Sequence, residues 1–287
     1  TLTVTDVNGN VSTCIANVTI EDTVPPAALC QDLTIQLDAT GNGSISASDV
    51  NNGSSDNCAI AGISLDDSTF ACADVGNNTV TLTVTDVNGN TATCTSTITV
   101  EDTVPPVAIC QNVTVQLDAG GNGSITASDV DGGSNDACGI ASLSATPTSF
   151  SCSNVGSNTV TLTVTDVNGN VSTCTAVATV EDTVPPVAIC QDITVQLSAS
   201  GNATITAADV DNGSNDACGI ASLSVNPTTF NCANVGSNTA TLTVTDVNGN
   251  VSTCTANVTI EDTVPPIAIC QDLTIQLDAT GNASITA

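Results

Sequence analysis

The chain has 287 residues and a formal net charge of −29, because it contains 29 acidic residues and no Lys, Arg or His. A polyanion without basic or base-stacking side chains is repelled by phosphate groups, which excludes nucleic acid as a partner. Hydrophobic residues make up 40% of the chain, and they alternate with Thr and Ser, which indicates a folded β protein and not a disordered one.

The sequence has an 80-residue period, since the decapeptide TLTVTDVNGN begins at Thr1, Thr81, Thr161 and Thr241. The cysteines keep the same register without insertions. A long fixed period predicts tandem modules that each bury their own core. The chain starts and stops inside a module, so we expect it to be part of a longer array. The predicted boundaries are 24–103, 104–183 and 184–263 for complete repeats, 1–23 for the C-terminal strands of a truncated repeat, and 264–287 for the N-terminal strands of another.

Within one repeat, the segment from Thr79 to Val87 alternates apolar and Thr residues, which predicts a strand with Val80, Leu82 and Val84 facing inward. Asn88-Gly89 then predicts a two-residue hairpin turn into a strand from Cys94 to Val100, with Ile98 on the inner face. Further strands are predicted at 108–117, 123–130 and 139–144, and near Phe150. Helical periodicity is absent.

Six or seven short strands per repeat, with turn signals about every ten residues, predict an all-β fold: a tandem array of immunoglobulin-like β-sandwich domains. Each repeat has one aromatic residue for its core, namely Phe70, Phe150 or Phe230. Such a thin core requires covalent reinforcement. No stretch reaches the roughly 18 apolar residues of a membrane span, so membrane insertion is not expected.

Fourteen cysteines recur at steps of 16, 28, 14 and 22 residues. This spacing does not match the Cys-x-x-Cys pairs of zinc or redox sites, and it favours disulfides in an oxidising, extracellular location. Four cysteines per repeat allow three connectivities. The sandwich favours Cys30–Cys94, Cys110–Cys174 and Cys190–Cys254, which leaves Cys58–Cys72, Cys138–Cys152 and Cys218–Cys232 to close local loops. Cys14 and Cys270 are expected to pair outside the sequence.

The string Val-Thr-Asp-Val-Asn-Gly-Asn, followed by Cys94, Cys174 or Cys254 and then by Glu-Asp-Thr-Val-Pro-Pro, resembles the hyalin-repeat (HYR) module. The resemblance extends over the whole chain and implies immunoglobulin-like domains of an extracellular adhesion protein. The acidic version with Asp-x-Cys-Gly-Ile is most similar to the giant adhesins of gliding Bacteroidetes, which are exported by the type IX secretion system and form surface filaments. The second cysteine pair departs from the simplest HYR module.

Acidic residues that recur in each repeat are candidate calcium ligands. One loop contains Asp129, Asp131 and Asp136, and it recurs as Asp209, Asp211 and Asp216 and as Asp49, Asn51 and Asp56. Closely spaced oxygen atoms around glycines suit Ca²⁺, although the spacing differs from an EF-hand. The alternative is a solvated acidic loop whose Asp and Asn residues serve turn geometry.

Two further acidic segments allow the same two interpretations. The hairpin turn supplies Asp86 and Asn88, Asp166 and Asn168, and Asp246 and Asn248; the Pro-Pro linker supplies Glu21 and Asp22, Glu101 and Asp102, and Glu181 and Asp182. The turn alone explains Asn88, and the two prolines stiffen the joint. We expect the loop and turn of one repeat to face the linker that enters it, so that calcium binds at the joints.

The linker also carries a short Asp-Thr-Val motif that resembles the O-glycosylation site of Bacteroidetes. It would place sugar on Thr23, Thr103, Thr183 and Thr263. Asn-x-Ser/Thr triplets, the signal for N-glycosylation, also occur, but Asn, Ser and Thr are so abundant in this chain that chance accounts for them.

The predicted function is that of a non-enzymatic structural segment of an extracellular filament or cell-surface adhesin, acting as a calcium-stiffened, disulfide-stabilised spacer in adhesion or gliding motility. Carboxylates and hydroxyls are the only reactive groups, and no imidazole or amine side chain can activate them. The expected partners are neighbouring repeats, laterally associated chains, and a surface or glycan target outside this segment. The alternative is an array of glycan-binding modules, but sugar-stacking aromatic residues are missing.

Overall fold

The structure is a computed structural model that describes residues 1–286, and it consists almost wholly of β-strands. Helices within the described residues are short: α1 (Ala47–Val50), α2 (Ala127–Val130) and α3 (Ala207–Val210) have four residues each, and the 3-10 helices η1 (Cys72–Asp74), η2 (Cys152–Asn154) and η3 (Cys232–Asn234) have three. None of the helices in this part of the chain is long and apolar enough to cross a membrane.

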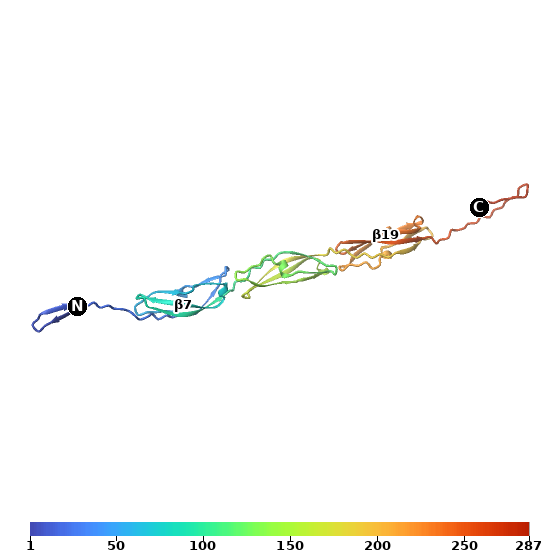
Figure 1. The fold of residues 1–287 in the computed structure, drawn as a ribbon. Helices are drawn as coiled ribbons and strands as arrows, with labels where there is room; N and C mark the ends of the chain where they lie inside the picture. The colour runs from blue at the N-terminus through green and yellow to red at the C-terminus, as the bar shows by residue number, and fades with distance from the viewer. Residues whose placement is uncertain (287) are drawn as a thin grey trace. The chain divides into compact units, whose positions relative to one another are not determined.

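The first complete repeat contains two sheets. Its strands are β3 (Leu33–Gln36), β4 (Asn42–Ser44), β5 (Ile60–Leu65), β6 (Thr69–Ala71), β7 (Gly76–Asp86) and β8 (Thr91–Glu101). A four-stranded sheet has the order β3-β8-β7-β5, in which β3 runs parallel to β8 and the other pairs are antiparallel. A second sheet pairs β4 with β6. Figure 1 labels β7 and its counterpart β19 in the third repeat.

The same topology recurs in the next two repeats. The middle repeat contains β9 (Val113–Gln116), β10 (Asn122–Ser124), β11 (Ile140–Thr146), β12 (Ser149–Ser151), β13 (Gly156–Asp166) and β14 (Val171–Glu181), and the third contains β15 (Ile193–Gln196), β16 (Asn202–Thr204), β17 (Ile220–Asn226), β18 (Thr229–Asn231), β19 (Gly236–Asp246) and β20 (Val251–Glu261). Their larger sheets have the orders β11-β13-β14-β9 and β15-β20-β19-β17. Near the N-terminus, β1 (Leu2–Thr5) and β2 (Val11–Cys14) form a hairpin. The predicted fold class, a disulfide-stapled array of immunoglobulin-like β-sandwich domains, is confirmed.

Contacts along the chain define two compact units. The first comprises Thr1–Thr114, Ser124–Ser149 and Ser157–Thr179, and the second comprises Val115–Gly123, Phe150–Gly156 and the chain from Val180 onward. The predicted domain boundaries follow the sequence period, and they stay a prediction.

The core of each repeat follows the alternation read from the sequence. Val80, Leu82 and Val84 of β7 are 0–1% exposed, and the intervening Thr residues lie on the outer face. Phe70 on β6 is 4% exposed and packs in the same cluster. Burying these branched side chains between the two sheets supplies the hydrophobic stabilisation of the repeat.

Two local predictions are wrong. The segment 123–130 is a strand only at its start, because Thr126 N–H and Oγ1–H donate to Asp129 Oδ2 at 2.7 and 2.8 Å and begin helix α2. This reciprocal capping favours a helical turn over a continued strand. The hairpin turn has three residues, since Asp86 N–H donates to Asn90 O and Gly89 adopts a φ of +93°. A type I turn closed by a glycine in this conformation is the usual three-residue hairpin.

The disulfides within repeats are the predicted ones: Cys30–Cys94, Cys110–Cys174 and Cys190–Cys254. The second set of predicted pairings is wrong. Cys72 bonds to Cys138 and Cys152 bonds to Cys218, so these disulfides join successive repeats, while Cys14, Cys58, Cys232 and Cys270 are free thiols.

The position of each cysteine in its repeat explains the error. Cys58 lies against Asp22 of the linker that enters its repeat, whereas Cys72 reaches the repeat that follows. A disulfide needs Cα atoms within about 7 Å, so cysteines that serve different joints cannot pair. Gly41 makes room for the bond between repeats, since a Cβ at this position would lie 2.5 Å from Cys72 Sγ. Cys232 has the equivalent place beside Gly201.

Truncating the buried leucine in each repeat should destabilise the whole array. We expect Leu82→Ala, Leu162→Ala and Leu242→Ala, made together, to cost about 2–5 kcal/mol per repeat, since each side chain is fully buried and leaves a cavity. Denaturant unfolding measures the loss. The matched control changes Val87, Val167 and Val247, which are 58–59% exposed, to Ala; an equal loss in both triple variants would contradict the assignment of the core.

Candidate functional site

Each hairpin turn holds the linker that enters its repeat. Asp86 Oδ1 accepts hydrogen bonds from the backbone N–H groups of Asn88 and Asn90 at 2.9 and 2.7 Å, and Asp86 Oδ2 accepts one from Asn90 Nδ2 at 2.8 Å. The same Nδ2 donates to the backbone oxygen of Asp22 at 3.0 Å. The aspartate therefore orients an asparagine amide that fastens the linker.

We call this arrangement the bracket: the Asp86 carboxylate, the Asn90 side-chain amide and the Asp22 backbone oxygen. The bracket recurs at both later joints. Asn170 Nδ2 donates to Asp166 Oδ2 at 2.8 Å and to the backbone oxygen of Asp102 at 3.1 Å. Asn250 makes the corresponding bonds to Asp246 and to Asp182 O, at the same two distances. The entry of the chain into each repeat is thus defined by hydrogen bonds from asparagine side chains and not by ion pairs.

The bracket also sets the protonation of its aspartates. Burial raises the pKa of Asp86, Asp166 and Asp246, which are each 1% exposed. Hydrogen bonds from the following Asn and Gly residues outweigh this effect, so the net pKa lies below the ordinary value of 3.8. These carboxylates are charged at neutral pH even though no basic side chain balances them.

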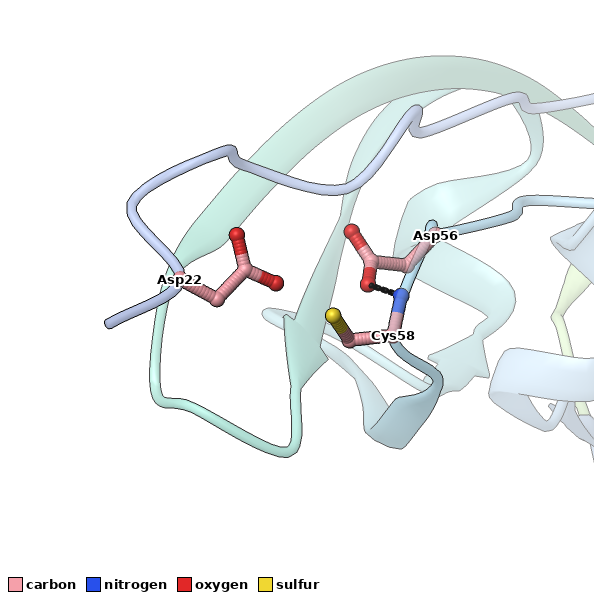
Figure 2. A group of neighbouring side chains, drawn as sticks. All are labelled: Asp22, Asp56 and Cys58. Carbon is pink, nitrogen blue, oxygen red and sulfur yellow. Dashed lines mark hydrogen bonds between the residues drawn. The ribbon is translucent and has the colours of Figure 1, made fainter. Parts of the chain in front are cut away.

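Beside each bracket, a linker aspartate meets an aspartate of the repeat that it enters. The groups are Asp22, Asp56 and Cys58; Asp102, Asp136 and Cys138; and Asp182, Asp216 and Cys218, and the ligand atoms within each group lie within 4.8 Å of one another. Figure 2 shows the first group, in which both carboxylates and the thiol point toward a common centre. No other residues of the described chain form such a group of acidic and cysteine side chains.

The linker carboxylates are only half satisfied. Asp102 is 8% exposed; its Oδ1 accepts from Val104 N–H at 3.0 Å, while its buried Oδ2 has no hydrogen-bond partner. Asp182 repeats this arrangement, and Asp22 Oδ2 and Asp56 Oδ1 are also buried without a partner. A buried polar atom without a partner costs free energy comparable to a lost hydrogen bond or more. Each joint therefore contains a buried carboxylate oxygen that has no hydrogen-bond partner.

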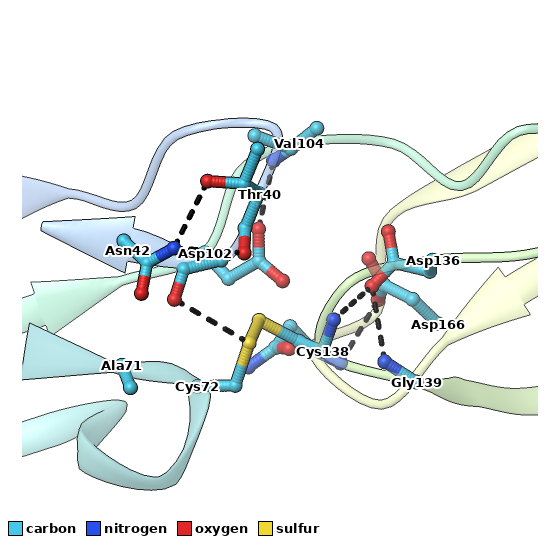
Figure 3. Close-up of a disulfide and its surroundings, with 12 residues drawn as sticks. Thr40, Asn42, Ala71, Cys72, Asp102, Val104, Asp136, Cys138, Gly139 and Asp166 are labelled. Carbon is cyan, nitrogen blue, oxygen red and sulfur yellow. Dashed lines mark hydrogen bonds between the residues drawn. A yellow bond between two sulfur atoms is a disulfide. The ribbon is translucent and has the colours of Figure 1, made fainter.

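The facing aspartate is held by the backbone around the cysteine. Asp136 Oδ1 accepts from the N–H groups of Cys138 and Gly139 at 2.8 and 3.1 Å. Figure 3 shows the Cys72–Cys138 disulfide with Asp102, Asp136 and Asp166 around it. Because the sulfur of Cys138 is oxidised, the oxygen atoms are the only ionic ligands of this group.

The first group keeps a free thiol. The capacity of the neighbouring Asp22 carboxylate to accept a hydrogen bond from the thiol, followed by burial and by the charges of Asp22, Asp56 and Asp86, raises the pKa of Cys58. Two of these carboxylates, Asp22 and Asp56, lie in the same group as the sulfur, within 4.8 Å. A thiol held in its neutral form is a poor nucleophile and a poor metal ligand.

Several of the predicted calcium ligands accept hydrogen bonds within their own repeat. Asp49, Asp129 and Asp209 accept from Ser46, Thr126 and Thr206 at the starts of the short helices, and Asn51, Asp131 and Asp211 accept from Ser54, Ser134 and Ser214. Glu101 and Glu181 accept from Gln36 and Gln116. Glu21 is exposed, and so are the side chains of Asn88, Asn168 and Asn248. The structure brings together the linker aspartate and the last aspartate of the loop, not the full predicted set.

The candidate glycosylation sites are exposed. Thr103, Thr183 and Thr263 donate through Oγ1 to Gln36, Gln116 and Gln196, at 2.7, 3.1 and 2.9 Å, and Thr23 is exposed in the first linker.

Sequence reasoning missed the asparagines that fasten the linkers, Asn90, Asn170 and Asn250. The signal was present, because the second Asn of Asp-Val-Asn-Gly-Asn recurs in every repeat and the hairpin turn alone does not require it. An Asn that follows the turn glycine once in every repeat is a candidate for a bond between modules.

Comparisons with known proteins are limited to general architecture. No protein-family model matches the chain, and no curated protein matches it. Among solved structures, three titin immunoglobulin domains (I67–I69) are 9% identical with a TM-score of 0.34, covering 83% of this chain and all of theirs. Protocadherin gamma B3 domains EC1–4 are 14% identical with a TM-score of 0.35, covering 84% and 76%, and Sidekick-1 immunoglobulin domains 1–4 are 8% identical with a TM-score of 0.31, covering 82% and 76%. At these TM-scores the likeness carries no argument about function.

The lowered pKa of the bracket aspartates predicts acid sensitivity. In the pH range just below 3.8, the unfolded chain takes up protons that the native state does not, so stability is present above that pH and is lost as pH falls through the lowered pKa. Thermal unfolding from about pH 6 to pH 2 should show the fall. The triple variant Asp86→Asn, Asp166→Asn and Asp246→Asn should fall less steeply, and Asn88→Ala, Asn168→Ala and Asn248→Ala, which keep the carboxylates, should not. Equal slopes in both variants would contradict the assignment.

Proposed function

We propose that this chain is a structural spacer of an extracellular filament or cell-surface adhesin, whose joints bind calcium. The observation that carries the proposal is the joint itself. Each linker is fastened by an asparagine amide, and each presents a buried aspartate to the aspartate of the repeat it enters. A repeated joint of constant chemistry is what a spacer of defined length and stiffness requires.

Calcium is the ion that best suits the joint. The available ligands are hard carboxylate oxygens, among them the unpartnered Asp102 Oδ2, and two carboxylates this close repel one another without a cation. The chain has no Lys or Arg to relieve the repulsion. The two aspartates of each joint supply fewer than the six to eight oxygens that Ca²⁺ takes, so water and backbone carbonyls would complete its shell.

The disulfides and the surface support an extracellular, non-enzymatic role. Five disulfides require an oxidising compartment. The motif resemblance to HYR modules and to Bacteroidetes gliding adhesins supports a surface filament, although no family model matches. Phe70, Phe150 and Phe230 are 3–4% exposed, so no aromatic ring is available to stack on a sugar. This favours a spacer over a glycan-binding array.

Metal binding at the joints should depend on the paired aspartates. We expect calorimetric titration with Ca²⁺ to find up to three sites per chain, one for each acidic group. Asp102→Asn with Asp136→Asn should remove one site, because it removes both charges of that joint. The comparison variant is Asp129→Asn with Asp131→Asn, whose carboxylates accept local bonds. Loss of a site in the comparison variant alone would favour the wider ligand set predicted from the sequence, and no bound metal in the parent chain would refute the calcium proposal.

A spacer should also have a defined length. The 11 residues of β7 rise about 3.3 Å each, and with loops and linker this predicts an axial step of roughly 35–45 Å per repeat. Electron microscopy of the chain with calcium and with a chelator measures the step and the bending. Chelation should increase bending without shortening the step. A compact particle would contradict the spacer, and unchanged bending would contradict calcium stiffening.

A further inference from the structure

The disulfide loops overlap along the whole array. Three bonds within repeats span 64 residues each, and the two bonds between repeats span 66 residues each. Cys72 precedes Cys94, and Cys138 follows Cys110, so the second loop begins before the first loop closes and ends after the third has opened. Every peptide bond between Cys30 and Cys254 therefore lies inside at least one disulfide loop.

Two separate covalent paths result from this overlap. The first crosses the disulfides within repeats and follows the linkers, in the order Cys30, Cys94, Cys110, Cys174, Cys190 and Cys254. The second crosses the disulfides between repeats and follows the backbone through β11 and β12, in the order Cys72, Cys138, Cys152 and Cys218. The two paths share no residue. The linkers lie only on the first path, which means that the second path bypasses every linker between these repeats.

We propose that the three complete repeats form a doubly connected covalent tether: residues 22–261 stay in one piece after the linkers between these repeats are cut, and unfolding cannot draw them out to the length of the free chain. This function goes beyond that of a spacer and depends on disulfide connectivity alone, not on bound metal. The linkers are the segments most in need of such protection, since they contain exposed positions such as Glu101 and Thr103 between folded domains.

The same connectivity limits extension. The second path contributes 14 residues of backbone per repeat, from Cys138 to Cys152, and one disulfide with a Cα–Cα distance of 5.1 Å. At about 3.3–3.6 Å per residue, this path reaches at most about 55 Å per repeat, compared with roughly 280 Å for a whole repeat without disulfides. The first path, with 16 linker residues from Cys94 to Cys110, sets a similar limit of about 60 Å.

The sequence itself provides the cleavage test. Its only glutamates are Glu21, Glu101, Glu181 and Glu261, one in each linker. After the free thiols are alkylated, a Glu-specific protease is applied to the unfolded, unreduced chain. Residues 22–261 should remain one disulfide-linked species, and reduction should release three pieces, 22–101, 102–181 and 182–261. Separate pieces without reduction, as the local pairs Cys138–Cys152 would give, would overturn the proposal.

Two cysteine variants sharpen this test. Cys72→Ala with Cys138→Ala should release residues 22–101 without reduction, because that variant lacks the only bond across the cut. The matched control, Cys110→Ala with Cys174→Ala, removes a bond that lies within one piece, so its species should stay intact. Retention of 22–101 by the first variant would show that a different pairing joins the repeats and would contradict the two paths.

Single-molecule stretching tests the limit on extension. The oxidised chain should not lengthen beyond about 55 Å per repeat at any force that leaves disulfides intact, and reduction should raise this limit about fivefold. Unfolding steps of about 240 Å in the oxidised chain, the gain expected when a whole repeat is drawn out, would overturn the tether. Chelation of calcium should leave the limit unchanged, so a failed calcium proposal and a failed tether give different results.

Discussion

The complete absence of basic side chains is the constraint on which the rest of this structure depends. A chain with 29 carboxylates and no Lys, Arg or His cannot form side-chain ion pairs, so its acidic groups must be satisfied by N–H and O–H donors. The structure shows this at the hairpin turns, the short helices and the linkers, where Asp86, Asp129 and Glu101 accept bonds from Asn, Thr and Gln. Hydrogen bonds to charged acceptors are stronger than neutral ones, which makes this substitution effective.

The same constraint explains why the joints are covalent. Contacts between acidic domains are opposed by long-range repulsion. A hydrogen bond such as that from Asn170 Nδ2 to Asp102 O contributes only about 1 kcal/mol. A disulfide between repeats holds the two surfaces together regardless of charge. The linker aspartate with an unpartnered oxygen then lies beside a second carboxylate, and a divalent cation bound there would relieve the repulsion between the two.

The sequence predicted what depends on periodicity and turn chemistry. Alternation placed Val80, Leu82 and Val84 in the core, and the sandwich fold favoured Cys30–Cys94. It failed where a residue acts across a repeat boundary. Cys72 and Cys138 are 66 residues apart, and a loop-closure argument prefers the nearer Cys58, so only the three-dimensional placement beside Gly41 decides the pairing. The linker aspartates were predicted to meet the loop, but which loop residue they meet depends on caps such as Thr126 with Asp129.

Because the repeats follow one another without insertions, each contact across a repeat boundary can recur along the chain. A bond from position n to position n + 66 is then available at each joint between complete repeats, and bonds of 64 and 66 residues in an 80-residue period overlap. Overlap needs no additional feature, because successive bonds begin at Cys30, Cys72 and Cys110, and each bond spans more residues than separate its start from the start of the next. The continuous covalent ladder therefore follows from one change, a second cysteine pair directed outward to the following repeat instead of inward. A pair closed within the repeat would also stabilise that repeat. It would, however, leave every linker between the complete repeats as a single covalent connection.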